Sequence, residues 1–198
     1  MELRKIGRGN PDFYAMLRIY EEAFPECERN WTEGDMLTAP ETPSERVSTE
    51  ILGIYLDEAP DELVGFFLTL VSDTAVYIYY FAIRHDFRSK GIGAKALKAI
   101  MERYGEKTLI LDYESIYQES DNPEQRKSRH AFYMRNGFHE TDYLAEQDGV
   151  ELIIACSSKD FRKEDYELFM AESPASVDKA NPVTIPFLRP DRTAANLT

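Results

Sequence analysis

Three strand-like runs follow one another almost without interruption in the middle of the chain, and they restrict the fold more than any other feature. The runs are STEILGIYLDE (48–58), ELVGFFLTLVS (62–72) and AVYIYYFAI (75–83), joined by the short segments APD and DT. Connections this short, with turn-forming residues, join neighbouring antiparallel strands. The last two runs are apolar almost throughout, as is typical of central strands covered on both faces. The pattern predicts an antiparallel meander at the centre of a sheet.

An amphipathic helix pattern over 92–104 and a further strand, TLILDYE (108–114), follow the meander. Because a helix between two strands makes a βαβ unit, the strand at 108–114 should lie parallel to the strand at 75–83. The predicted fold class is therefore α/β in the broad sense, or α+β. It has a mixed, mostly antiparallel twisted sheet with one parallel crossover, flanked by helices.

Other segments predict the elements around this centre. Apolar residues at helical spacing predict a helix over 13–23, and the stretch TAPETPSERVS (38–48) predicts an exposed, mobile loop. A polar connection leads into SRHAFYMRNGF (128–138), which predicts a short helix ended by Asn-Gly. Residues 138–157 then predict a closing hairpin with an Asp-Gly turn.

The chain is expected to divide near residue 156. Residues 1–156 hold all of these elements and are predicted to form one domain. Residues 157–198 are predicted to add a charged helix and an extension that packs on the domain or forms an interface. This segment could extend a substrate pocket, cover a sheet edge or mediate formation of a homodimer, and the sequence leaves these alternatives open.

Charge and composition exclude some partners. The formal net charge is −13, which argues against nucleic acid as the main partner. The charge suits a cationic small molecule or basic peptide, and it can also serve solubility alone. No apolar stretch approaches the roughly 18 residues of a membrane span, and the first residues lack the apolar run of a secretory signal. A cytoplasmic protein without membrane partners is expected. Cys27 and Cys156 lack a metal-type spacing, so no metal is expected.

Two glycines one residue apart, in GIGAKA (91–96), stand just before the helix pattern and fit a dinucleotide-binding fingerprint. Asp112 even lies nineteen residues beyond Gly93, where a ribose-binding acid is expected. However, seven residues separate Ile83 from Gly91, whereas a Rossmann strand runs almost directly into its first glycine. The preceding meander and the little chain that remains also argue against a doubly wound fold.

The alternative counts Arg88 as part of the motif, which then reads R-x-x-G-x-G. Glycines let the backbone approach an anion, and N–H groups at a helix start can receive it. Arg88 adds a charged fork and Lys90 a point charge. This pattern predicts a pyrophosphate-binding loop formed by Arg88, Ser89, Lys90, Gly91, Ile92, Gly93 and Ala94.

At these residues the sequence resembles the GNAT superfamily of acetyl-CoA-dependent N-acetyltransferases. FAIRHDFRSKGIGAKAL (81–97) matches the acetyl-CoA motif of that family, and AFYMRNGF (131–138) is similar to its later motif. The resemblance covers roughly residues 1–156. His85 departs from a frequent proline. Arg126 and Arg129 stand where the family often has Asn and Ala, so an Asn contact to the cofactor is not expected here.

The resemblance implies transfer of the acetyl group of acetyl-CoA to a primary amine of a small molecule or peptide, by direct attack in a ternary complex. Backbone groups of Phe81, Ala82 and Ile83 would hold the pantetheine arm, and residues 88–94 the pyrophosphate. Tyr133 is the family's candidate acid beside the sulfur. A non-catalytic GNAT-like module that binds or senses acyl-CoA is the alternative.

The sequence indicates the general base, which would deprotonate the amine, less clearly than it indicates the acid. An alkyl amine has a pKa of about 10.4 and must lose a proton before it attacks. Glu114 is the first candidate, because it lies at the open end of its strand, where ligands bind. Asp112, Glu22 and a water relay remain open. Aromatic and acidic residues that could receive the amine, or simply pack and face solvent, are Phe24, Trp31, Tyr79, Tyr80, Glu22, Glu26 and Glu28.

Overall fold

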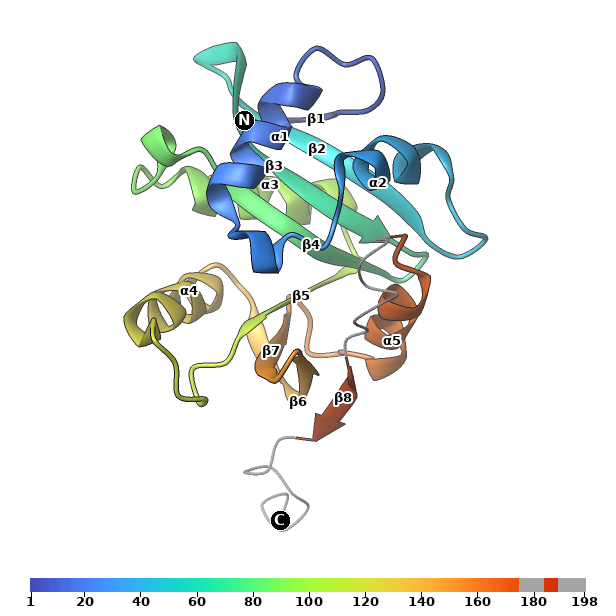
Figure 1. The fold of residues 1–198 in the computed structure, drawn as a ribbon, viewed down its shortest axis with the longest axis vertical. Helices are drawn as coiled ribbons and strands as arrows, with labels where there is room; N and C mark the ends of the chain where they lie inside the picture. The colour runs from blue at the N-terminus through green and yellow to red at the C-terminus, as the bar shows by residue number, and fades with distance from the viewer. Residues whose placement is uncertain (175–183, 189–198) are drawn as a thin grey trace.

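The computed structural model describes residues 1–174 and 184–188 (Figure 1). Its centre is an eight-stranded sheet in the order β1-β2-β3-β4-β5-β7-β6-β8. The strands are β1 (Glu2–Lys5), β2 (Ser48–Leu56), β3 (Ala59–Val71), β4 (Ala75–Ile83), β5 (Thr108–Glu114), β6 (His139–Gln147), β7 (Val150–Cys156) and β8 (Thr184–Leu188). Within the described residues, β4 and β5 pair in parallel and the other neighbouring strands pair antiparallel. The predicted mixed sheet with one crossover is confirmed.

Helices cover both faces of the sheet (Figure 1). The helices are α1 (Phe13–Ala23), α2 (Glu33–Thr38), α3 (Ile92–Tyr104), α4 (Pro123–Arg135) and α5 (Lys163–Glu172). α1, α2 and α5 pack over one core cluster, which includes Phe66 and Tyr77. α3 and α4 pack over a second cluster, which includes Phe67 and Ile78. Adjacent residues of a strand point to opposite faces, so each of the strands β2 to β7 supplies both clusters.

A β-bulge interrupts this alternation in β4. Its pairing with β3 passes from Leu68 opposite Tyr80 to Thr69 opposite Ile78, which leaves Tyr79 as an extra residue. Tyr79 and Tyr80 therefore both pack on the face covered by α1 and α5. Phe81, the next residue, packs on the opposite face with α3 and α4.

Two predicted boundaries were wrong. β3 begins at Ala59, which pairs with Leu56, so the turn is the two residues before Ala59 rather than APD. Two-residue turns join antiparallel strands most tightly, and this hairpin uses one. α4 begins at Pro123, five residues before the predicted start of the helix. Proline suits the first turn because its missing N–H has no partner there in any helix.

The stretch predicted as an exposed loop, residues 38–48, is partly structured. A 3-10 turn spans Ala39–Glu41. Ala39 and Val47 are buried in the core, so the segment is anchored at both ends. The residues between them are mostly exposed, as expected.

The C-terminal region contributes to the sheet and to its cover. α5 packs against β4, and β8 pairs with β6 at the edge of the sheet. For this part of the chain the sequence predicts an extension and leaves its contacts open. None of the helices in residues 1–174 and 184–188 has the length and apolar character needed to cross a membrane. The cytoplasmic location, the homodimer and the division at residue 156 stay predictions.

Candidate active site

β4 and β5 pair only along their first residues. Ala75–Tyr77 lie opposite Thr108–Ile110, and the ladder between the two strands ends there. Beyond that point a cavity of about 1170 Å³ is lined by residues 77–83 of β4 and 111–114 of β5. Ligand sites of α/β sheets commonly lie where strands part in this way, because backbone groups are left without strand partners.

The loop before α3 forms one wall of the cavity. Ser89 and Gly91 have φ angles of 62° and 75°, which turn successive backbone N–H groups toward one side. Gly91 also caps α3, so the positive end of the helix dipole faces the same wall. Arg88 Nε donates to the carbonyl oxygen of Ile83 at 2.9 Å, which ties the loop to β4. This wall can receive an anion.

Gly93 keeps the start of α3 close to α4. A Cβ on Gly93 would lie 3.2 Å from the Cζ atom of Phe132, which is tighter than ordinary van der Waals contact. A larger residue at position 93 would push the two helices apart at the cavity wall.

Most of the residues predicted to hold a cofactor line this cavity, and two do not. The eight that line it are Phe81, Ala82, Ile83, Arg88, Ser89, Gly91, Gly93 and Ala94. Lys90 does not, because its Nζ atom lies 5.2 Å from the ring centre of Phe87. Ile92 is 6% exposed and packs into the core beneath α3.

Tyr133 reaches the cavity from α4. Its ring stacks on Tyr113 with centroids 5.2 Å apart and meets Phe138 edge-on at 5.8 Å. Loss of hydration raises the pKa of Tyr133 to about 12; the positive charge of Arg129 opposes the rise, and the negative charge of Asp112 adds to it. No described residue hydrogen-bonds the hydroxyl, so it is a protonated group that can donate to a ligand.

Glu114 also lines the cavity, and both of its oxygens are engaged. Arg126 donates to Oε1 at 2.8 Å and Arg129 to Oε2 at 3.1 Å. Arg126 further donates to the carbonyl of Ser115 at 3.1 Å and to Oδ1 of Asn122 at 3.0 Å. The two arginines that depart from the family pattern therefore bind Glu114. The sequence did not reveal this, since residues 114 and 126 belong to different elements.

Asp112 lies two residues before Glu114 and lines the cavity from the same strand. Its Oδ2 atom accepts a hydrogen bond from the hydroxyl of Tyr77 at 2.9 Å and another from that of Tyr166 at 2.6 Å. Burial, with the nearby negative charge of Asp112, raises the pKa of Tyr77 well above its usual value. Both tyrosine hydroxyls therefore remain donors to the carboxylate.

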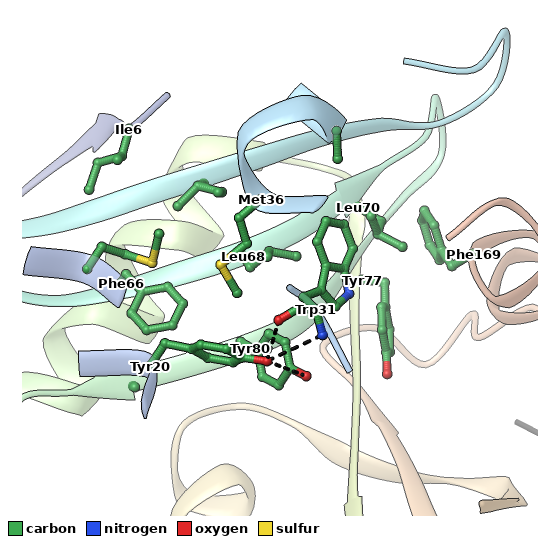
Figure 2. Close-up of a cluster of buried hydrophobic side chains, with 14 of the residues drawn as sticks. Ile6, Tyr20, Trp31, Met36, Phe66, Leu68, Leu70, Tyr77, Tyr80 and Phe169 are labelled. Carbon is green, nitrogen blue, oxygen red and sulfur yellow. Dashed lines mark hydrogen bonds between the residues drawn. The ribbon is translucent and has the colours of Figure 1, made fainter. Parts of the chain in front are cut away.

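Two tyrosine hydroxyls hold the segment after α1, one from Tyr80 on β4 and one from Tyr20 on α1 (Figure 2). Tyr80 accepts from the backbone N–H of Asn30 and donates to the carbonyl of Glu28, both at 2.8 Å. Tyr20 donates to the carbonyl of Trp31 at 3.1 Å. The Trp31 side chain is 2% exposed and belongs to the core, so it does not line the cavity as a substrate residue would.

Of the other predicted acceptor residues, Phe24, Tyr79, Tyr80 and Glu28 line the cavity, whereas Glu22 and Glu26 do not. Loss of hydration raises the pKa of Glu28, the charge of Arg129 opposes this and that of Glu114 adds to it. The charges of Arg129 and of Glu114, the last residue of β5, therefore both act on Glu28.

Some lining residues carried no sequence signal. The tip of the β6–β7 hairpin contributes Gln147 and Asp148, and α5 contributes Met170. These residues reach the cavity only because β7 pairs with β5 and α5 packs against β4. In residues 1–174 and 184–188, no group of three or more His, Cys, Asp or Glu side chains is arranged to hold a metal ion.

The sequence matches a model of the acetyltransferase (GNAT) family over residues 13–138, more than half of the chain. No curated protein matches the sequence.

Solved structures share the fold at low sequence identity. A protein from Bacteroides thetaiotaomicron assigned to the GNAT family has a TM-score of 0.66 and 22% identity, over 85% of this chain and 93% of that one. The ribosomal-protein-S18-alanine N-acetyltransferase from Escherichia coli has a TM-score of 0.52 and 19% identity, over 81% and 98%. An aminoglycoside 6′-N-acetyltransferase complexed with coenzyme A has a TM-score of 0.55 and 15% identity, over 79% and 96%.

Proposed function

Because the chain belongs to the GNAT family of acetyltransferases, we propose that it transfers the acetyl group of acetyl-CoA to a primary amine by direct attack in a ternary complex. One observation carries the proposal: a single cavity joins an anion-receiving loop to a protonated tyrosine hydroxyl and two carboxylates of β5. The acceptor is a small-molecule or peptide amine.

The cofactor side of the cavity consists of the loop before α3 and the end of β4 that no longer pairs with β5. Acetyl-CoA supplies the acetyl group as a thioester, and its negatively charged pyrophosphate suits the anion-receiving loop on this side of the cavity. Arg88 and the backbone N–H groups of residues 89–94 would hold the pyrophosphate. Backbone groups of Phe81, Ala82 and Ile83 would hold the pantetheine arm, although the carbonyl of Ile83 already accepts from Arg88. Tyr133 would protonate the leaving thiolate.

The acceptor side must take a proton from the attacking amine. Glu114 is the weaker candidate, because its two oxygens accept from the guanidinium groups of Arg126 and Arg129, and these positive charges oppose the approach of a cationic amine. Asp112 accepts from neutral hydroxyl groups at Oδ2. We therefore propose Asp112, rather than Glu114, as the group that binds the amine and takes its proton, directly or through one water.

The charge of this side favours a cationic acceptor. Four acidic side chains line the cavity against three arginines, which leaves the lining with a net charge of −1, and the whole chain carries a net charge of −13. A negative cleft raises the local concentration of a cationic amine and the rate of its encounter.

Titration of the protein with acetyl-CoA is the direct test of the proposal. Heat of binding is expected at micromolar to low millimolar ligand, followed by release of free coenzyme A when an amine is added. Absence of binding at millimolar acetyl-CoA would refute the proposal. Binding without acetyl transfer to any amine would limit the function of the protein to recognition of the coenzyme.

The contacts of the loop before α3 lead to a separate, quantitative prediction. Replacing Arg88 by Ala should raise the Kd for coenzyme A about tenfold, because a hydrogen-bonded charge at the cavity wall is lost. The matched variant Lys90→Ala should raise it less than about threefold, because Lys90 lies over Phe87 and does not line the cavity. Calorimetric titration of both variants measures the difference; equal losses would show that Lys90 also contacts the coenzyme.

A further inference from the structure

α5 lies outside residues 13–138, the part that the family model matches, yet it reaches the cavity. Met170 lines the cavity directly. Tyr166 is fully buried, and its hydroxyl donates to Asp112 at 2.6 Å. A helix that follows the matched domain therefore supplies one of the donors that hold the carboxylate.

Several contacts fix α5 on β4. The side chain of Thr74, just before β4, donates to Asp165 at 2.9 Å, and Asp165 is 5% exposed. The ring of Tyr77 meets Tyr166 edge-on at 5.8 Å and stacks on Phe169 at 6.0 Å. Phe169 lies beside Tyr77 in Figure 2. These buried contacts set the position of the Tyr166 hydroxyl relative to β4 and β5.

We infer that α5 is part of the acceptor site, and that Tyr166 is a positioning residue that holds the Asp112 carboxylate in place for the amine. A carboxylate is planar, so two donors on Oδ2 fix the position of both oxygens. A fixed anion can bind a cationic amine without first being ordered, which lowers the cost of binding. The inference rests on the proposed function and assigns part of the acceptor side to a segment outside the matched domain.

The location of Asp112 distinguishes this arrangement from an ordinary core hydrogen bond. Asp112 lines the cavity, whereas a purely structural acceptor would be enclosed. Its negative charge also acts on Tyr133. Burial is the main cause of the raised pKa of Tyr133; the positive charge of Arg129 opposes the rise, and the negative charge of Asp112 adds to it. The carboxylate therefore lies between the helix that positions it and the proposed acid.

The test uses the full chain with acetyl-CoA and two small nucleophiles, methylamine, which is cationic at neutral pH, and hydroxylamine, which is largely uncharged. Tyr166→Phe keeps the buried ring and removes only the hydroxyl. It should lower kcat/KM for methylamine about tenfold, mainly through KM, because a hydrogen bond to a charged group is lost. The rate with hydroxylamine and the KM for acetyl-CoA should each change less than about twofold.

Two further variants make the test specific. Tyr55→Phe is the matched control, because its hydroxyl donates to Asp12 at 2.7 Å away from the cavity; its kinetics should equal those of the wild type. In an Asp112→Asn background, Tyr166→Phe should have less than a twofold further effect, because a residue that acts through Asp112 has nothing left to position.

The outcomes separate the two proposals. If the wild type neither binds acetyl-CoA nor reacts with hydroxylamine, the proposed function fails. If the wild type reacts but Tyr166→Phe leaves the KM for methylamine unchanged, or has an equal effect with and without Asp112, the role of α5 is refuted and the function stands. A general loss of stability would show as a lower Tm and would reduce the rates with both nucleophiles alike.

Discussion

Replacing Tyr133 by Phe lowers kcat by about 100-fold or more and leaves the Kd for acetyl-CoA within about twofold, if this hydroxyl protonates the leaving thiolate. The substitution removes one hydroxyl that no described residue hydrogen-bonds, so the fold loses no contact. Turnover measured by thiol release, with the Kd from titration, gives both quantities.

The pKa of Tyr133 adds a pH criterion to this expectation. Because loss of hydration raises the pKa to about 12, the hydroxyl stays protonated from pH 6 to pH 9, and no fall in kcat over that range should come from its ionisation. Tyr104→Phe is the control, because its hydroxyl donates to Glu50 at 3.0 Å, away from the cavity. Unchanged turnover in Tyr133→Phe would exclude Tyr133 as the acid.

Replacing Arg126 by Met is expected to lower the free energy of unfolding by about 3 kcal/mol, the largest stability change foreseen for a site residue. The Arg126 side chain is only 8% exposed. Its loss leaves the carbonyl of Ser115 without this donor and removes one of the two charges on Glu114. Chemical denaturation measures the change.

Arg129→Met provides the matched comparison for Arg126, because both arginines bind the same carboxylate. The side chain of Arg129 is 30% exposed and makes one hydrogen bond to Glu114, so the expected loss is below about 1 kcal/mol. Equal losses in the two variants would show that burial does not decide the strength of these contacts.

The sheet and the loop could be predicted because their signals are local. Alternating or continuous apolar runs, short turns and one helix between two strands determine most of the strand order. The start of α4 was missed although Asn122 and Pro123 form a recognisable helix start. The polar composition of the segment before residue 128 favours a connection rather than a helix. The start of β3 differs from the prediction for a related reason: Ala59–Asp61 contains a proline, which is typical of turns, yet these residues belong to the strand.

The candidate site could be predicted only where it is continuous in sequence. The loop 88–94 and Tyr133 lie in recognisable motifs, and most of their residues line the cavity. The contact between Asp112 and Tyr166 joins residues 54 positions apart, on elements with no mutual pattern. For Trp31 the sequence leaves two alternatives open, a ligand contact and a place in the core. An aromatic residue near a predicted site is as suited to the core as to a ligand, and here the core holds it.

The bulge at Tyr79 determines which face of the sheet each later residue of β4 reaches. If β4 alternated regularly through Tyr79, with no bulge, the side chains beyond Tyr79 would exchange faces, because alternation has a period of two. Phe81 would then face α1 and α5, and Tyr80 would face α3 and α4, opposite to their present sides. A homologous chain of the same length that lacks the bulge should therefore turn residue 80 toward the proposed coenzyme side and residue 81 toward the proposed amine side. Its acceptor preference cannot be transferred from this protein by aligning motifs alone.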